Sequence, residues 1–353
     1  MVGKLNIVSL FDGISCGRVA LDRAGIAVNS YSAFEIDKMA RAISRYNYPD
    51  IRQCGDVLDA DFKQFTGHDI VMGGSPCTFW SIAKAKHGRE IDKSGVGWKL
   101  FMRYVEAVRV ISPRFFIYEN VASMHQNIRD YISEELGAEP VLINSALVSA
   151  QSRKRLYWTN IPNVAQPEDK GIMLKDIITS GLPYQDKSHC ITATYDGAVF
   201  WNSIIRRQRS MIAEPIRVGH FASGGQGNRI YSVQSKSVSF MAQGGGRGGK
   251  VGLYKVDLPD GDYVVRKLTP VEAERCQTLP DDYTAFGVYD NGKTKRISTT
   301  QRYKCVGNAW TVDVIAHILN FADCGNKNLY KPNGGFYEFF NKNIGADTPH
   351  RRP

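Results

Sequence analysis

The fold is decided by the stretch Asp69-Ile70-Val71-Met72-Gly73-Gly74-Ser75-Pro76-Cys77-Thr78-Phe79-Trp80-Ser81. It begins as a short apolar strand, ends in a tight Gly-Gly turn and continues into Pro76 and Cys77. A buried strand that stops at glycines directs the next residues to the end of a sheet, where open α/β sheets bind their ligands. Cys77 is therefore a candidate for chemistry. The alternative is a buried structural thiol, because free cysteine is among the most buried residue types.

Strands and helices alternate through the first part of the chain. The apolar patterns predict strands over 5–11, 27–35, 69–72, 115–118 and 139–147, a short strand leading into 52–57, and helices over 18–25, 38–46 and 100–110. Such a rhythm of strand and helix predicts a parallel sheet with helices on both faces.

A glycine turn follows the first strand, and the second strand ends at Glu35. In nucleotide-binding halves of this kind, glycines let the backbone approach the ligand, and an acid about 20 residues later takes ribose hydroxyls. The spacing here is Gly13-x-x-x-Gly17, without the GxGxxG that cradles a pyrophosphate. This favours an adenosyl ligand without phosphates over a dinucleotide, and a tight turn without any ligand is the alternative.

Further polar groups are predicted near Cys77. Glu119 ends the buried strand 115–118 and would lie on the same rim of the sheet, where a desolvated carboxyl suits a group that holds or donates a proton. In a strand, Gln151, Arg153 and Arg155 would share one face, because side chains alternate with period two. Three donors on one face suit an anion or a base edge, and a solvated charged edge strand is the alternative.

The composition limits the class of protein. The 353 residues carry a net charge of +10, which favours a polyanionic partner. Seven scattered cysteines without a CxxC pair argue against a disulfide framework and a zinc site, so we expect a cytoplasmic protein without a metal. The sequence has no apolar run of about 18 residues and no room for a secretory signal before the first strand, so we expect no membrane association.

The composition changes after Pro162. Residues 163–265 are rich in glycine, serine and arginine, which predicts a small, mostly β or irregular domain with loops against a polyanion backbone. Strands are expected over 251–256 and 263–265, and a flexible linker is an alternative for 244–249. Regular structure resumes at residue 266, with a helix over 271–277 capped by Thr269 and a second helix from 301 to 320. We therefore divide the chain into 1–162, 163–265, 266–325 and a loose tail, 326–353.

Six motifs, in order, resemble those of the DNA (cytosine-5) methyltransferase family over roughly the first 320 residues. They are Leu10-Phe11-Asp12-Gly13-Ile14-Ser15-Cys16-Gly17, Ser75-Pro76-Cys77, Glu119-Asn120-Val121, Gln151-x-Arg153-x-Arg155, Arg266-Lys267-Leu268-Thr269-Pro270-x-Glu272-x-x-Arg275-x-Gln277 and Gly307-Asn308-Ala309. The first turn is similar to that of mammalian de novo methyltransferases, and the glycine-rich middle is similar to phage and bacterial members. The resemblance implies a Rossmann-like methyltransferase sheet, with 163–265 as target recognition domain.

The resemblance also implies roles for single residues. Cys77 matches the nucleophile that attacks cytosine C6, Glu119 the acid that holds protonated N3, and Arg153 and Arg155 the arginines beside the base. The residues matched to S-adenosylmethionine are Phe11, Asp12, Gly13, Ile14, Glu35, Ile36, Asp56, Val57, Gly74, Pro76, Asn308, Ala309 and Trp310. We assign contacts with double-stranded DNA to Ser81, Arg206, Arg207, Arg229 and Arg247.

This chemistry places demands on the chain. The target cytosine has to leave the duplex. The pKa of Cys77 should fall, and we expect nearby arginines and helix N-terminal amides to lower it. Many members of the family carry Gln after the Pro-Cys pair, whereas this chain has Thr78-Phe79-Trp80. We expect the protein to act as a monomer and to release S-adenosylhomocysteine.

Three other functions compete with this interpretation. A cytosine-5 methyltransferase acting on RNA is disfavoured because the Cys-Phe-Thr signature of those relatives is absent. A catalytically silent nucleic-acid-binding module is disfavoured because Cys77, Glu119 and Arg153 are all retained. A dinucleotide oxidoreductase is disfavoured by the missing GxGxxG.

Overall fold

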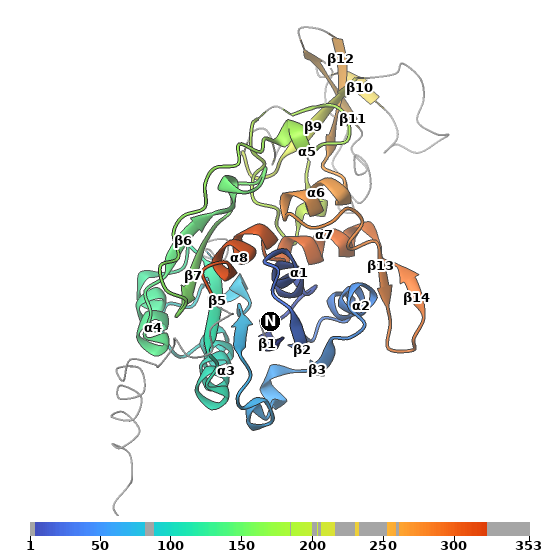
Figure 1. Ribbon diagram of the computed structural model, residues 1–353. Coiled ribbons are helices and arrows are strands. Elements are labelled where there is room, and N and C mark those ends of the chain that lie inside the picture. Colours follow the sequence, from blue (N-terminus) through green and yellow to red (C-terminus); the bar gives the residue numbers. More distant parts are fainter. Residues whose placement is uncertain are drawn as a thin grey trace, which may run out of the picture.

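A seven-stranded sheet forms the centre of the protein in the computed structural model (Figure 1), which describes residues 4–81, 88–183, 185–199, 203, 206–215, 230–232, 253–258 and 261–322. Its strand order is β3-β2-β1-β4-β5-β7-β6. The strands are β1 (Leu5–Leu10), β2 (Val28–Phe34), β3 (Arg52–Gly55), β4 (Ile70–Gly73), β5 (Phe115–Val121), β6 (Val141–Asn144) and β7 (Lys154–Thr159). The predicted α/β methyltransferase-type sheet is confirmed.

The first five strands pair in parallel, as predicted, but β7 runs antiparallel to both β5 and β6. Helix α4 (Gln126–Leu136) provides the long crossover from β5 to β6 that parallel strands require. The connection from β6 to β7 has no helix of that length, so β7 turns back and inserts between them. This reversal brings residues of β7 beside the end of β5.

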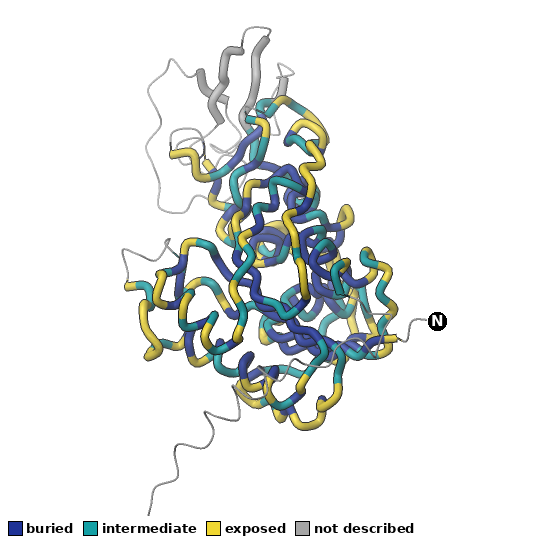
Figure 2. Tube along the Cα trace, turned by 60° about the vertical axis from the view of Figure 1, so that its left-hand side comes forward, coloured by how far each residue is buried: buried dark blue, intermediate teal, exposed yellow. Residues whose placement is uncertain are grey.

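Helices cover both faces of the sheet. One face packs against α1 (Cys16–Arg23), α2 (Lys38–Asn47) and α8 (Val312–Leu319), and the other against α3 (Val96–Ile111) and α4. Alternate strand residues point to opposite faces, so Ile7 joins the first layer and Val8 the second. Figure 2 shows the buried segments running through the interior and the exposed ones at the periphery.

A second sheet lies within the predicted recognition segment and stands at the top of Figure 1. Its order is β10-β11-β12-β9-β8. Its strands are β8 (Leu182–Pro183), β9 (Met211–Pro215), β10 (Ile230–Ser232), β11 (Leu253–Leu258) and β12 (Gly261–Lys267). Strand β12 continues through the predicted boundary at 265/266, and the short helix α5 (Leu174–Ile177) precedes this sheet in the chain.

A third apolar cluster joins this segment to the C-terminal part of the chain. Leu174, Ile191 and Tyr195 pack there with Leu268 and Val306. The second half of the chain also holds α6 (Pro270–Cys276), α7 (Thr299–Asn308) and the hairpin β13 (Phe286–Val288) and β14 (Thr294–Arg296). The 3-10 turns are η1 (Val57–Asp59), η2 (Phe62–Phe65), η3 (Cys77–Phe79), η5 (Ser145–Leu147) and η6 (Tyr195–Gly197).

The structure confirms one C-terminal prediction and corrects another. Thr269 and Glu272 form the expected capping box at the start of α6. The single helix predicted over 301–320 is wrong, because α7 ends at Asn308 and α8 begins at Val312. The main chain leaves the helix there because Arg153 donates to the carbonyl oxygens of Gly307 and Ala309. None of the helices in the described part of the chain is long and apolar enough to cross a membrane.

Candidate active site

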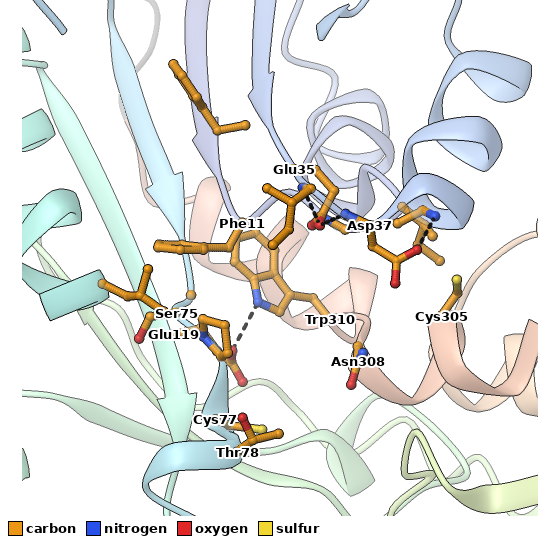
Figure 3. A pocket seen from close by; sticks show the side chains of 18 of the residues that line it. Phe11, Glu35, Asp37, Ser75, Cys77, Thr78, Glu119, Cys305, Asn308 and Trp310 are labelled. Atoms are coloured by element: carbon orange, nitrogen blue, oxygen red, sulfur yellow. Dashed lines mark hydrogen bonds between the residues drawn. The ribbon is translucent and has the colours of Figure 1, made fainter. Parts of the chain in front are cut away.

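One cavity of about 320 Å³ opens at the carboxyl ends of the parallel strands (Figure 3). That volume is within the range of small-molecule sites in proteins, roughly 300 to 1,000 Å³. The turn after β1, the end of β2, the loop after β4, the end of β5 and the link between α7 and α8 all contribute to its wall. Residues distant in sequence therefore meet around a single space.

Most of the predicted site residues line this cavity. All four catalytic candidates do so, namely Cys77, Glu119, Arg153 and Arg155. The cofactor candidates that line it are Phe11, Gly13, Ile14, Glu35, Ile36, Asp56, Val57, Gly74, Pro76, Asn308 and Trp310. Two cofactor candidates, Asp12 and Ala309, do not.

Asp12 and Ala309 lie outside the cavity lining and make hydrogen bonds that hold the neighbouring lining residues in place. The Asp12 carboxylate accepts hydrogen bonds from the Tyr31 hydroxyl at 2.7 Å and from the Ser15 hydroxyl at 2.6 Å. Burial raises the pKa of Asp12, and these hydroxyl donors offset that rise only in part. The carbonyl oxygen of Ala309 accepts from Arg153 at 3.1 Å. Both residues thus fix the turns that the cavity residues occupy.

The glycine turn holds Glu35 in place at one end of the cavity. Gly13 has a φ of 61°, in the left-handed region that favours glycine, and its N–H donates to Glu35 Oε2 at 2.8 Å. The N–H groups of Ile36 and Asp37 donate to Glu35 Oε1 at 2.8 and 2.7 Å. Burial nevertheless keeps the pKa of Glu35 above its usual value. Beside it, the apolar Ile36 side chain is 67% exposed at the cavity wall.

Cys77 stands at the other end, in the loop after β4. The buried Asn120 side chain donates to the carbonyl oxygen of Ser75 at 3.1 Å, which ties this loop to β5. Burial raises the pKa of Cys77, and the positive charge of Arg155 offsets that rise only in part. The expected lowering of this pKa is therefore wrong. The effect of burial on the pKa of Cys77 is larger than the opposite effect of the arginines. The turn η3, which begins at Cys77, is too short to add a strong helix dipole.

The Glu119 carboxylate has a donor on each oxygen. Arg155 Nε lies 2.9 Å from Oε1, and the Trp310 indole N–H donates to Oε2 at 3.1 Å. The residue belongs to β5, which continues to Val121 beyond the predicted strand 115–118. Figure 3 shows the carboxylate on the same side of the cavity as Cys77.

The predicted row of Gln151, Arg153 and Arg155 does not form one strand face, because β7 begins only at Lys154. Gln151 is fully buried, donates to the carbonyl oxygen of Cys276 at 3.0 Å and lies away from the cavity wall. Arg153 binds main-chain oxygens of Ile191, Gly307 and Ala309. Only Arg155 faces Glu119 directly.

The loop after Cys77 is anchored by the residues that depart from the family pattern. Trp80 is fully buried, packs edge-on against Phe101 and donates to Glu90 Oε2 at 3.2 Å. Thr78 is exposed and lines the cavity. Of the residues that differ from the family pattern, Trp80 therefore packs in the core and Thr78 faces the cavity.

Of the residues predicted to contact DNA, none that the structure describes is among those that line the cavity. Ser81 is half-buried, and its N–H donates to the carbonyl oxygen of Cys77 at 2.9 Å. Arg206 and Arg207 are exposed in the recognition segment. Arg229 and Arg247 lie outside the described residues.

Several cavity residues were not among the predicted site residues. These are Phe34, Asp37, Ala40, Gly55, Ser75, Thr78, Leu100, Lys304, Cys305 and Gly307. Asp37 caps α2 and pairs with Lys304 at 2.5 Å. An aspartate before an amphipathic helix is a recognisable cap signal, but no local pattern predicts a partner 267 residues away. Cys190, 3.3 Å from Arg153 Nη1, was also missed.

Comparisons with known proteins identify the family of the chain. The model of the family "C-5 cytosine-specific DNA methylase" matches residues 5–322. The chain is 28% identical over 346 residues to type II methyltransferase M.HhaI of Haemophilus parahaemolyticus, covering 93% of this chain and 96% of that protein. It is 26% identical over 318 residues to orphan methyltransferase M.Rho11sI of Bacillus phage rho11s, covering 73% of this chain and 62% of that protein.

A solved structure shares the fold. The methyltransferase EhMeth of Entamoeba histolytica superposes with a TM-score of 0.60 at 15% identity, covering 90% of this chain and 98% of that one. The family match spans nearly the whole described chain and includes every strand of both sheets. The chain therefore belongs to the C-5 cytosine-specific DNA methylase family and is a DNA (cytosine-5)-methyltransferase.

Proposed function

We propose that this methyltransferase binds S-adenosylmethionine at the Glu35 end of the cavity and a cytosine, extruded from double-stranded DNA, at the Cys77 end. The observation that carries the proposal is the convergence of Cys77, Glu119 and Arg155 on the same cavity as Glu35 and its glycine turn. A methyl donor and its acceptor have to meet in one space. This cavity has one group of polar residues at the Glu35 end for the donor and another at the Cys77 end for the acceptor.

The Glu35 end suits an adenosyl group. The Glu35 carboxylate is held by three main-chain N–H groups and retains acceptor capacity for ribose hydroxyls. The uncovered Ile36 side chain offers an apolar surface for an adenine ring. When bound, S-adenosylmethionine supplies a sulfonium-activated methyl group, and S-adenosylhomocysteine is the product. The other residues proposed to hold S-adenosylmethionine are Phe11, Gly13, Ile14, Asp56, Val57, Gly74, Pro76, Asn308 and Trp310. Asp12 and Ala309 would act indirectly, by holding the turns that carry these residues.

The Cys77 end suits covalent catalysis. Cytosine C5 is a weak nucleophile, and an addition at C6 turns it into an enamine carbon. Cys77 loses its proton and its sulfur bonds to C6, while a proton is taken up at N3 and held there by Glu119, so that in net terms the thiol proton has moved to N3. The C5 carbon then takes the methyl group. Loss of the C5 hydrogen as a proton lets the sulfur–C6 bond break and releases the thiolate. N3 then gives up its proton, which yields 5-methylcytosine.

The two arginines have different parts in this proposal. Arg155 Nε holds Glu119 Oε1 and stands where it can also meet the base. Arg153 acts as a positioning residue, because its guanidinium fixes the main chain at Gly307 and Ala309. This assignment differs from the resemblance, which placed both arginines beside the base and favoured Arg153 over Arg155 as the contact.

The DNA contacts are proposed from charge and position. The net charge of +10 supports phosphate binding, which positions a protein on DNA without selecting sequence. Residues 163–265 would form the recognition domain, with Arg206 and Arg207 as exposed contacts and Ser81 beside the base. Residues 1–162 and 266–325 would form the catalytic domain. We propose that the protein acts as a monomer.

The proposal is tested by incubation with labelled S-adenosylmethionine and random-sequence duplex DNA, followed by mapping of the modified bases. Structured RNA of matching sequence serves as the parallel substrate. We expect 5-methylcytosine in the DNA, and Cys77→Ala should remove it while DNA binding persists. Methyl groups on adenine, or on the RNA alone, would overturn the proposal.

A further inference from the structure

Trp310 lies between the two ends of the cavity. It lines the cavity together with Phe11 and Glu35, and Figure 3 shows its indole nitrogen directed at Glu119. The indole N–H donates to Glu119 Oε2 at 3.1 Å. The residue belongs to the link between α7 and α8, 191 positions further along the chain. Its side chain therefore lines the shared cavity and reaches the Cys77 end through Glu119.

We propose that Trp310 is a positioning residue for methyl transfer, whose indole N–H fixes the Glu119 carboxylate in the orientation that meets the cytosine. The inference rests on the proposed role of Glu119. It adds a group that acts through Glu119 and does not itself touch the reacting atoms.

The hydrogen bonds of Glu119 leave room for the base. An ionised carboxylate offers about four acceptor sites on its two oxygens. Arg155 occupies a site on Oε1 and Trp310 a site on Oε2. With a donor on each oxygen, the carboxylate cannot rotate freely about its last bond. One site on each oxygen remains for the substrate.

The main chain next to Trp310 is held by two buried side chains. Arg153 donates to the carbonyl oxygen of Ala309, the residue before it, at 3.1 Å, and the Gln277 side chain donates to the same oxygen at 3.3 Å. Arg153 and Gln277 come from separate parts of the chain, and both are buried. The main chain that carries the indole is thus fixed from two directions.

Gly74 shows how closely the pair is packed. A Cβ atom at this position would lie 3.0 Å from Glu119 Oε2 and 3.4 Å from the Trp310 indole nitrogen. It would also lie 2.7 Å from the main-chain oxygen of Glu119, closer than real Cβ contacts allow. The absence of a side chain at Gly74 makes the space in which the carboxylate and the indole meet.

The first test is Trp310→Phe, which keeps a ring in the cavity and removes the donor. At saturating S-adenosylmethionine and DNA, we expect the single-turnover rate of methyl transfer to fall about 10- to 100-fold, the range for loss of one hydrogen bond to a charged group. Because Trp310 also belongs to the residues proposed to hold S-adenosylmethionine, the affinity for the cofactor is measured separately, and saturation keeps any loss of affinity out of the measured rate. A rate equal to that of the native protein would overturn the inference.

Trp158→Phe is the matched control. It makes the same substitution and removes the bond from the Trp158 indole N–H to the Ser133 hydroxyl, 3.0 Å long, in the core away from the cavity. We expect it to lower stability and to leave the single-turnover rate unchanged. An equal loss of rate in both variants would reduce Trp310 to a general packing role and overturn the inference.

A spectroscopic test does not depend on activity. In protein labelled with ¹⁵N-tryptophan, the indole resonance missing from Trp310→Phe identifies Trp310 among the five tryptophans. Glu119→Gln should shift this resonance strongly, and an unmoved resonance would overturn the inference. If Glu119→Gln instead shifts the resonance but keeps the native rate, the hydrogen bond exists and the proposed role of Glu119 is what fails.

Discussion

Arg155 Nε lies 2.9 Å from Glu119 Oε1, and both side chains are largely buried. The sheet register explains this pair. In the antiparallel pairing of β5 and β7, Glu119 stands opposite Tyr157 and Val121 opposite Arg155, so Glu119 and Arg155 are diagonal neighbours on one face. The reversal of β7, which the sequence did not predict, is therefore what brings a cation to the proposed proton-holding carboxylate.

Breaking this pair should destabilise the protein. Arg155→Ala leaves a buried carboxylate without its cation, a change that costs about 3 to 5 kcal/mol for fully buried pairs and somewhat less in this open cavity. Urea unfolding measures the loss. Adding Glu119→Gln to Arg155→Ala removes the unpaired charge and should recover part of the stability. No recovery in the double variant would contradict the electrostatic explanation.

The pH dependence of the reaction follows from Cys77. Burial raises the pKa of this thiol above its usual value, and the nearby arginine does not reverse the shift. Because the thiolate is the attacking form, its fraction rises about tenfold per pH unit for as long as the pH stays below the pKa. We expect the single-turnover rate to rise with this slope through neutral pH. A rate that is flat between about pH 6 and 8 would show that the thiol is already ionised.

Cys190 should behave in the opposite way. Burial raises the pKa of Cys190, but Arg153 and Arg155 together outweigh burial, so its pKa lies below the usual value. Alkylation by iodoacetamide at neutral pH, followed by peptide mass spectrometry, should modify Cys190 faster than Cys77, because the thiolate is the reactive form. The rate at Cys190 should persist in Cys77→Ser. Preferential labelling of Cys77 in the native protein would reverse the assigned order.

The capping box of α6 provides a prediction about stability alone. The Thr269 hydroxyl accepts from the Glu272 N–H at 3.2 Å, and the Glu272 carboxylate accepts from the Thr269 N–H at 2.8 Å. Thr269→Ala should lower the free energy of unfolding by about 1 kcal/mol. Thr269→Ser keeps the oxygen and should cost much less. Equal losses in the two variants would mean that the methyl group, and not the cap, stabilises this turn.

Much of the cavity could be predicted because it follows from local rules. Residues after parallel strands gather at one rim, so the positions of Glu35, Cys77 and Glu119 followed from where their strands end. The capping box at Thr269 was predicted for the same reason, since its signal spans four residues.

The remaining features depend on contacts between distant segments. The break between α7 and α8 exists because Arg153 binds carbonyl oxygens more than 150 positions away. The pKa of Cys77 is set by how deeply its loop is buried, and the Asp37–Lys304 pair by the docking of α7 beside α2. None of these leaves a periodic or local pattern in the sequence.

The central claim is that Cys77 bonds to the base during methyl transfer. The most direct measurement uses duplex DNA in which fluorine replaces the C5 hydrogen of cytosine, because the final loss of a proton from C5 is then blocked. With S-adenosylmethionine present, we predict a stable protein–DNA adduct whose mass includes the transferred methyl group and which maps to Cys77. Cys77→Ala should form none. Methyl transfer without an adduct, or an adduct at Cys190, would contradict the account.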